Sequence, residues 1–270
     1  MFKNITIGQY VDGDSFIHKM DARIKILLTL FYIFVLFIIT SPAAYILFAA
    51  FTVFLIFLSG VPIKFVLRGL RPMLFILVFT AAINLFMTGG ETVLWTCPFW
   101  SSMRITEEGL KTAVMMILRL VFLVAGTSVL TLTTTPLMLT DGIEKLLKPF
   151  EIIKVPSHEI AMMMTIAIRF IPTLSEETEK IMKAQMARGA DFESGNIFRR
   201  AKAMIPLLVP LFISAFRRAD ELAVAMDSRC YQGGKHRTRM KVMKMTYRDA
   251  VASAFMLAVA AAAVLIQNLF

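Results

Sequence analysis

The sequence predicts an all-α integral membrane protein with about five transmembrane helices and a cytoplasmic helical region that contains two long helices. Three observations predict this class. Hydrophobic residues make up 57% of the chain, only 18% of the residues are charged, and the mean hydropathy is +0.71. Long uncharged runs recur along the chain, so the apolar residues are concentrated in segments that can cross a bilayer.

The first uncharged stretch predicts two spans. It places 38 residues between Lys25 and Lys64, which as one helix would run about 57 Å, well beyond a hydrocarbon core of about 30 Å. Thr40, Ser41 and Pro42 are expected to break it. Three further runs of roughly 20 residues predict the remaining spans; they are residues 72–90, 120–140 and 250–270. The first hydrophobic run begins late and its flank lacks a small-residue cleavage site, so no removable signal peptide is expected.

The distribution of Lys and Arg predicts the orientation, because positive charge stays on the cytoplasmic side. Residues 132–248 hold 19 Lys and Arg against 12 Asp and Glu, and the N-terminal segment and the loop after the second span are also basic. The loop 91–110 is acidic and is expected outside. We therefore expect spans one to four with a cytoplasmic N-terminus in residues 1–131, a cytoplasmic region in 132–245, and a final span in 246–270 with an outside C-terminus.

Two helices are predicted in the cytoplasmic region. The apolar runs 160–168 and 203–216 are too short to cross, so they are read as helices on the membrane surface or packed against each other. A helix cap at Thr173 or Ser175 and a glycine at Gly189 predict a first helix over 174–188. A second helix is predicted over about 209–229, with Gly233 and Gly234 beyond it.

A short pattern occurs twice, once at the end of each predicted helix. The two copies are 41 positions apart and share an arginine; they are Ala184, Gln185, Met186, Ala187, Arg188, Gly189 and Ala225, Met226, Asp227, Ser228, Arg229, Cys230. One arginine at a helix C-terminus usually only complements the helix dipole. Two with matching surroundings favour docking, since a guanidinium can bind carboxylates bidentately while the apolar stripe beside it fills a groove. Two equivalent sites indicate two similar partner subunits.

Other function classes find less support in the sequence. The basic balance follows from the topology, with no aromatic-interleaved basic patch for nucleic acid. No phosphate-binding Gly-Lys loop and no clustered histidines are present, so we expect neither catalysis nor a metal or cofactor site in this chain. Cys97 and Cys230 fall on opposite sides of the membrane and cannot pair. A self-contained secondary transporter is the alternative, but its spans should carry repeats and midplane polar groups.

These segments together resemble the CbiQ/EcfT family, the transmembrane coupling subunits of energy-coupling factor importers for vitamins and metal ions in prokaryotes. The resemblance covers almost the whole chain and rests on SFIHKMDARIKILL (15–28), RPMLFILVFTAAINLFMTGG (71–90), LTLTTTPLMLTDGIEKLLKP (130–149), 166–191 and 206–234. It implies a non-catalytic subunit in the cell membrane. Two Ala-Arg-Gly signatures at the ends of two coupling helices would dock two ABC-type ATPases, which hold ATP and Mg, and pass their motion to a separate small substrate-binding membrane subunit, one or several.

This chain departs from the family pattern at three positions. Ala187, Arg188 and Gly189 match the signature, but Ser228 and Cys230 replace its alanine and glycine in the second copy. Cysteine lacks glycine's ease at positive φ, so the second helix ending is expected to be the one that can differ. Ala22 replaces a proline near the first helix start. The role of Arg119 stays open between an interfacial residue and a buried functional charge.

Overall fold

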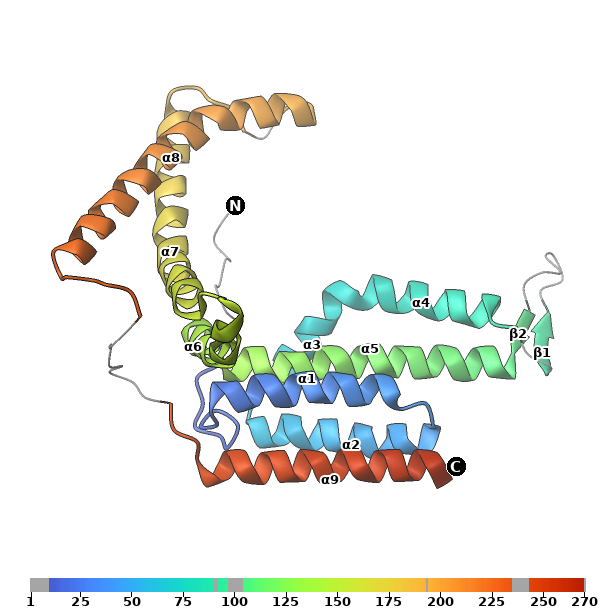
Figure 1. The fold of residues 1–270 in the computed structure, drawn as a ribbon. Helices are drawn as coiled ribbons and strands as arrows, with labels where there is room; N and C mark the ends of the chain where they lie inside the picture. The colour runs from blue at the N-terminus through green and yellow to red at the C-terminus, as the bar shows by residue number, and fades with distance from the viewer. Residues whose placement is uncertain (1–9, 90–91, 97–103, 193, 235–242, 270) are drawn as a thin grey trace. The chain divides into compact units, whose positions relative to one another are not determined.

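The computed structural model describes residues 10–89, 92–96, 104–192, 194–234 and 243–269. In chain order the elements are α1 (Ala22–Ile38), α2 (Pro42–Ser59), α3 (Ile63–Leu70), η1 (Arg71–Met73), α4 (Leu74–Met87), β1 (Val93–Thr96), β2 (Arg104–Thr106), α5 (Glu107–Thr133), α6 (Pro136–Leu147), η2 (Lys148–Ile153), α7 (Ser157–Ala187), α8 (Ile197–Asp227) and α9 (Tyr247–Leu269) (Figure 1). The predicted all-α membrane class is confirmed.

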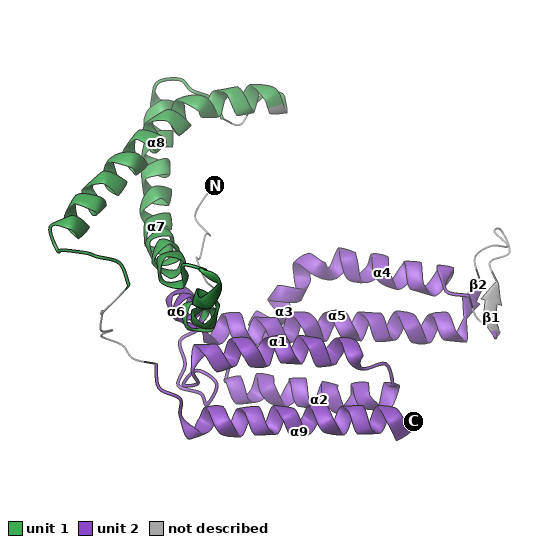
Figure 2. Cartoon of the chain, in the orientation of Figure 1, with its two compact units in different colours: residues 1–7, 143–241 green, residues 8–142, 242–270 purple. Residues whose placement is uncertain are grey.

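The chain divides into two compact units (Figure 2). The membrane unit comprises residues 8–142 and 242–270, and the α7–α8 unit comprises residues 143–241. In the membrane unit α1, α2, α5 and α9 pack side by side, and α3 and α4 pack along α5. In the α7–α8 unit the two long helices pack against each other.

Four helical segments of the described chain are long and apolar enough to cross a membrane, and all belong to the membrane unit. They are Pro42–Ser59, Ile63–Met87, Glu107–Thr133 and Tyr247–Leu269. The first predicted span corresponds to α1, which has 17 residues and is one residue shorter than α2. The predicted break is confirmed, because α1 ends at Ile38 and α2 begins with Pro42 at its first position.

The uncharged run 120–140 overlaps α5, a candidate membrane span that extends further toward the N-terminus and ends at Thr133. The Thr106 hydroxyl accepts a hydrogen bond from the Gly109 N–H, and Glu107 and Glu108 suit the positive end of a helix, so α5 begins at Glu107. It ends at Thr133, and Pro136 starts α6. The loop before α5 also contains an antiparallel pair, β1 and β2, which the hydropathy pattern does not predict.

A cluster of buried side chains from α1, α2, α5 and α9 forms the core of the membrane unit. Tyr32 is at its centre: the hydroxyl donates to the Phe122 carbonyl at 3.0 Å and lies 2.9 Å from the Thr52 hydroxyl. Gly126 lets the ring approach α5, since a Cβ at this position would lie 2.4 Å from Cε1 of Tyr32. The two helices are thereby joined by both packing and a buried hydrogen bond.

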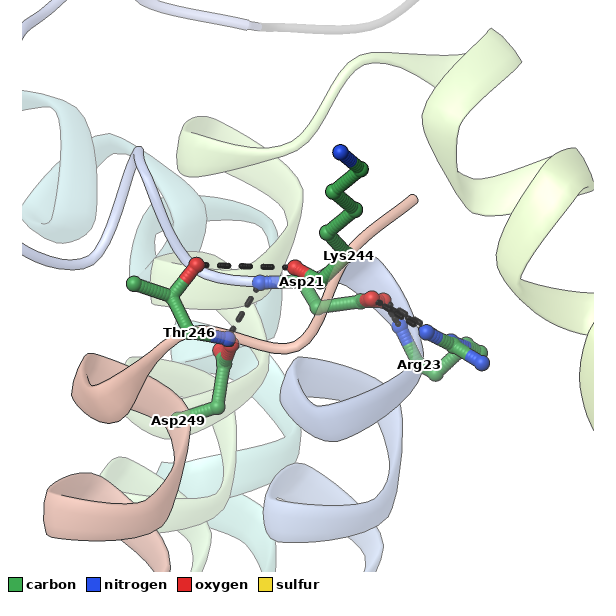
Figure 3. A network of polar contacts seen from close by, with 5 residues as sticks. All are labelled: Asp21, Arg23, Lys244, Thr246 and Asp249. Carbon is green, nitrogen blue, oxygen red and sulfur yellow. Dashed lines mark hydrogen bonds and ion pairs between the residues drawn. The ribbon is translucent and has the colours of Figure 1, made fainter. Parts of the chain in front are cut away.

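Two charged side chains tie helix ends together within the membrane unit. Lys25 is buried, and its ammonium donates to the carbonyl oxygen of Thr133 at 3.0 Å and to the Thr134 hydroxyl at 3.3 Å, at the C-terminus of α5. The Asp249 carboxylate accepts the backbone N–H of Asp21 at 2.9 Å and that of Thr246 at 2.8 Å (Figure 3). The starts of α1 and α9 therefore share one carboxylate.

Arg119 has a structural role in the membrane unit. Its guanidinium donates to the Ile39 carbonyl at 3.0 Å, at the end of α1, and to the Tyr45 hydroxyl of α2 at 2.9 Å. It also lies over the Phe37 ring, 5.6 Å from the centroid. These donors hold the corner between α1 and α2.

The predicted starts of α7 and α8 are wrong. α7 begins at Ser157 and continues through Pro172, so neither Thr173 nor Ser175 is a cap, and α8 begins at Ile197 and continues through Pro206 and Pro210. A proline inside a helix removes one hydrogen bond. The two helices pack against each other, and the apolar runs 160–168 and 203–216 become parts of these longer helices.

Candidate functional site

The end of α7 is a complete helix-terminating turn. The N–H of Ala190 donates to the Gln185 carbonyl at 3.0 Å, and the N–H of Gly189 donates to the Met186 carbonyl at 2.9 Å. Gly189 has a φ of +87°, the left-handed conformation that reverses the chain in this type of turn. Arg188 is therefore the C-cap residue, as the glycine signal predicts.

The end of α8 repeats this turn bond for bond. The N–H of Tyr231 donates to the Met226 carbonyl at 3.1 Å, and the N–H of Cys230 donates to the Asp227 carbonyl at 2.9 Å. Cys230 has a φ of +54°. The helix ending therefore does not differ between the copies, contrary to what the loss of glycine allowed. The two hydrogen bonds that close the turn hold Cys230 in the left-handed conformation, which costs a residue with a Cβ about 1 kcal/mol.

Ser228 fits the alanine position without leaving an unpaired hydroxyl. Its Oγ donates to the carbonyl of Ala225 in the preceding turn at 3.1 Å. This self-satisfied hydrogen bond leaves the backbone turn unchanged. The two copies of the pattern thus differ in side-chain chemistry but not in the path of the main chain.

Both arginines are exposed at the ends of their helices. Among the described residues, the ion pairs of the chain involve neither Arg188 nor Arg229. Seven residues before each arginine, on the same face of its helix, lies an apolar residue. These residues, Ile181 and Leu222, are both half-buried. Each helix end therefore presents an unneutralised guanidinium, with five donors, beside an apolar stripe.

Polar contacts hold α7 and α8 together at a crossing point. Glu177 accepts hydrogen bonds from the Ser214 hydroxyl at 2.5 Å and from the Arg218 guanidinium at 2.8 Å. The hydrogen bond from Ser214, together with that from Arg218, holds the pKa of the Glu177 carboxyl below its ordinary value. Closer to the end of α7, the Gln185 amide lies 3.4 Å from the Pro206 carbonyl.

A second polar cluster was not predicted from the sequence. His158, near the start of α7, lies between the Glu144 carboxylate of α6 and the Tyr231 hydroxyl, which directly follows the second arginine pattern. The sequence gives no signal for it, since these residues are 14 and 73 positions apart. Only the fold brings them together.

The membrane unit contains an apolar cavity of about 360 Å³ between α1, α2, α5 and α9. Four polar side chains contribute to its lining, and each is hydrogen-bonded within the chain; they are Lys25, Thr29, Tyr32 and Thr133. Their polar atoms are committed to the fold. In the part of the chain that the structure describes, no cluster of three or more His, Cys, Asp or Glu residues could hold a metal ion.

Comparisons with known proteins agree on one family. The family model described as CbiQ, cobalt transport protein, matches residues 13–241. A relative from Clostridium kluyveri is 57% identical over 255 residues, which cover 94% of this chain and 93% of the relative. A relative from Thermosediminibacter oceani is 56% identical over 250 residues, with 93% of each chain covered.

A third relative, from Ruminiclostridium cellulolyticum, is 52% identical over 251 residues, which cover 93% of this chain and 92% of the relative. All three relatives are named energy-coupling factor transporter transmembrane protein EcfT. The matches span both units, including both arginine patterns up to residue 241. The chain belongs to the CbiQ/EcfT family of energy-coupling factor transporter transmembrane proteins.

Proposed function

We propose that this chain is the non-catalytic coupling subunit of an ATP-driven importer, and that Arg188 and Arg229 each dock one of two similar ATPase subunits. The observation that most supports docking by the two arginines is the equivalence of the two helix ends. Both end in the same hydrogen-bonded turn, with an exposed arginine at the same position. Equivalent presentation of one cation in two places fits two copies, or two close relatives, of one partner.

Docking would use the arginine of each helix end and the small residue that precedes it. The guanidinium forms a bidentate pair with a carboxylate of the ATPase, and Ala187 or Ser228, both small and exposed, allow the partner's surface to approach closely. Removing one partner of a charge pair that is desolvated in this way weakens binding by about 2–5 kcal/mol. The docking set is thus Ala187, Arg188 and Gly189 in one copy and Ser228, Arg229 and Cys230 in the other.

Energy transfer follows from the crossing of α7 and α8. ATP and Mg are bound by the partner subunits, whose closure moves the two arginine-bearing ends relative to each other. The Glu177 contacts with Ser214 and Arg218 carry this motion from one helix to the other. A separate small membrane subunit binds the vitamin or other micronutrient and receives the motion. The complex lies in the cell membrane of a prokaryote, with the N-terminus of this chain in the cytoplasm and its C-terminus outside.

The cavity in the membrane unit argues against the alternative of a self-contained secondary transporter. A transported solute needs polar groups that are free to bind it. The polar groups lining the cavity are already bonded within the chain, Tyr32 to Phe122 and Lys25 to Thr133 among them. This supports substrate recognition by a partner subunit.

The test is to co-express the tagged chain with its two ATPases and to measure how much ATPase co-purifies. Arg188→Ala and Arg229→Ala should each lower ATPase recovery, and the double variant should abolish it. Arg169→Ala on α7 and Arg217→Ala on α8 are matched controls, since both arginines are exposed on the same helices away from the turns. Equal ATPase recovery in the double variant and in the controls would refute docking by these arginines.

Transport separates the proposal from its alternative. Proteoliposomes with the chain alone should take up no substrate, and uptake should require the ATPases, the substrate-binding subunit and ATP. Uptake by this chain without partners would establish the secondary transporter instead.

A further inference from the structure

The α7–α8 unit is held together at a second place besides the crossing. The first attachment is the crossing, where Glu177 contacts Ser214 and Arg218 of α8 and the Gln185 amide lies 3.4 Å from the Pro206 carbonyl. The second involves the chain just after α8. There the Tyr231 hydroxyl lies 2.8 Å from Sδ of Met162 and 3.3 Å from Nε2 of His158, both near the start of α7.

The His158 ring is oriented from its other side by α6. Its Nδ1 lies 3.2 Å from the Glu144 carboxylate, and because a carboxylate accepts, Nδ1 carries a proton. The other ring nitrogen, Nε2, faces the oxygen of the Tyr231 hydroxyl, which donates its proton to Sδ of Met162. Gly234 closes over the ring, where a Cβ would lie 2.6 Å from Cγ and Cδ2 of His158. Contacts with Glu144, Gly234 and Tyr231 thus hold the His158 ring in place.

The crossing contacts involve only residues 177–185 of α7, so the Tyr231 contact attaches the chain after α8 to α7 at a second, distant place. Between them α7 runs from His158 to Glu177, and α8 runs from Ser214 to Asp227. At about 1.5 Å per residue these lengths are roughly 28 Å and 20 Å. The crossing and the Tyr231 contact therefore close a triangle, with one side along α7 and one along α8. Without the second contact, the angle of α8 would depend on the contacts at the crossing alone.

We propose that the Tyr231–His158 contact is a brace that sets the angle between α7 and α8 and so the spacing of the two arginines. Arg229 precedes Tyr231 by two residues within the same hydrogen-bonded turn. Arg188 is at the opposite end of α7 from His158. The brace therefore fixes Arg229 relative to Arg188 through α7. Tyr231 and His158 are positioning residues, and their effect on docking rests on the function proposed above.

Distance measurement on the purified chain alone tests the brace without any ATPase. One spin label is placed on the native, exposed Cys230 and another on Lys183→Cys of α7, with Cys97 replaced by serine. The unchanged pair should give one narrow distance distribution. Tyr231→Phe keeps the ring and removes only the hydroxyl. It should lower the ratio of braced to unbraced chains by roughly 2- to 12-fold, which corresponds to a net hydrogen bond of about 0.5–1.5 kcal/mol.

Matched variants separate bracing from general packing. His158→Phe should broaden the distribution as Tyr231→Phe does. His158→Gln, which still offers polar groups to both Glu144 and Tyr231, should keep it narrow. Tyr247→Phe removes an exposed tyrosine hydroxyl elsewhere and should change nothing. A narrow distribution in both Tyr231→Phe and His158→Phe overturns the brace.

ATPase recovery then tests what the brace is for. Tyr231→Phe and His158→Phe should lower ATPase co-purification although Arg229 is intact, and His158→Gln should restore it. Broadened distances with full ATPase recovery, in an assay where Arg229→Ala lowers recovery, would overturn the link between the brace and docking. Broadened distances with full recovery in Arg188→Ala and Arg229→Ala would instead refute the proposed function and leave the brace standing.

Discussion

The backbone N–H of Asp21 donates a 2.9 Å hydrogen bond to Oδ1 of Asp249, which joins two helix starts that are 228 residues apart. The other oxygen of Asp249 accepts from the N–H of Thr246 at 2.8 Å (Figure 3). The Asp21 carboxylate in turn caps α1 by accepting from the Arg23 N–H. The first and last helices of the membrane unit therefore depend on one buried carboxylate.

Asp249→Asn should destabilise the chain by about 1–3 kcal/mol, because an amide offers only one acceptor oxygen and turns an N–H toward a second N–H. Thermal unfolding in mild detergent measures this. Asp14→Asn is the matched control, since Asp14 is exposed and pairs only with Lys19 at the surface, and it should cost little. Equal melting temperatures for the two variants would contradict the shared role of Asp249.

The stability of the α1 start should depend on pH in the acid range. Burial opposes ionisation of Asp21, but hydrogen bonds from Arg23 outweigh it and lower the pKa of Asp21 below its ordinary value of 3.8. A lowered folded-state pKa contributes stability above pH 3.8, and this contribution is lost as the pH falls below 3.8 through the folded pKa. Melting temperature should therefore fall with acidification, and less steeply in Asp21→Asn. Parallel pH profiles would exclude this contribution.

Gly126→Ala should destabilise the membrane unit, because the added Cβ would lie 2.4 Å from the Tyr32 ring. The ring cannot move aside freely, since its hydroxyl is bonded to Phe122 and Thr52. Overpacking costs about 1–3 kcal/mol, and the better helix propensity of alanine offsets up to about 1 kcal/mol of it.

Two controls define the Gly126 result in thermal unfolding. Gly89→Ala adds a Cβ with no atom within 4 Å and should be close to neutral. In a Tyr32→Leu background the cost of Gly126→Ala should largely disappear, because the clashing ring is gone. A cost that persists in that background would show that the ring is not its cause.

The two helix-ending turns should respond oppositely to exchange of their left-handed residue. Gly189→Ala places a Cβ at a φ of +87° and should cost roughly 1–2 kcal/mol, whereas Cys230→Gly relieves the strain at +54°. Amide hydrogen exchange at Ala190 and Tyr231, whose N–H groups close the turns, measures each effect. Exchange of the Ala190 amide should become faster in Gly189→Ala, and exchange of the Tyr231 amide should not become faster in Cys230→Gly. Faster exchange in Cys230→Gly alone would contradict the equivalence of the two turns.

Features that depend on neighbouring residues were predicted well. The membrane class, the break before Pro42 and the helix end at Arg188 all follow from hydropathy, from proline at a helix start, or from a glycine that can adopt positive φ. Each involves interactions within a few residues, so the sequence signal is local.

Predictions failed where distant packing competes with a local signal. Thr173 and Ser175 predicted a helix start, yet α7 passes through them and packs against α8. Cys230 in place of glycine allowed a different helix ending, but the same two hydrogen bonds close the turn after α8 as after α7. Arg119 could not be assigned from its own segment, since its partners Ile39 and Tyr45 are 80 and 74 residues away.

The sequence by itself determined that this is a helical membrane protein of the CbiQ/EcfT family with two repeated arginine patterns, because composition, hydropathy and short motifs are properties of contiguous residues. Only the tertiary structure decided that the two patterns form the same turn, that the Asp249 carboxylate accepts hydrogen bonds at the starts of both α1 and α9, and that Tyr231 contacts His158. These relationships join residues up to 228 positions apart. They exist only once packing has offset the conformational entropy lost in bringing those residues together.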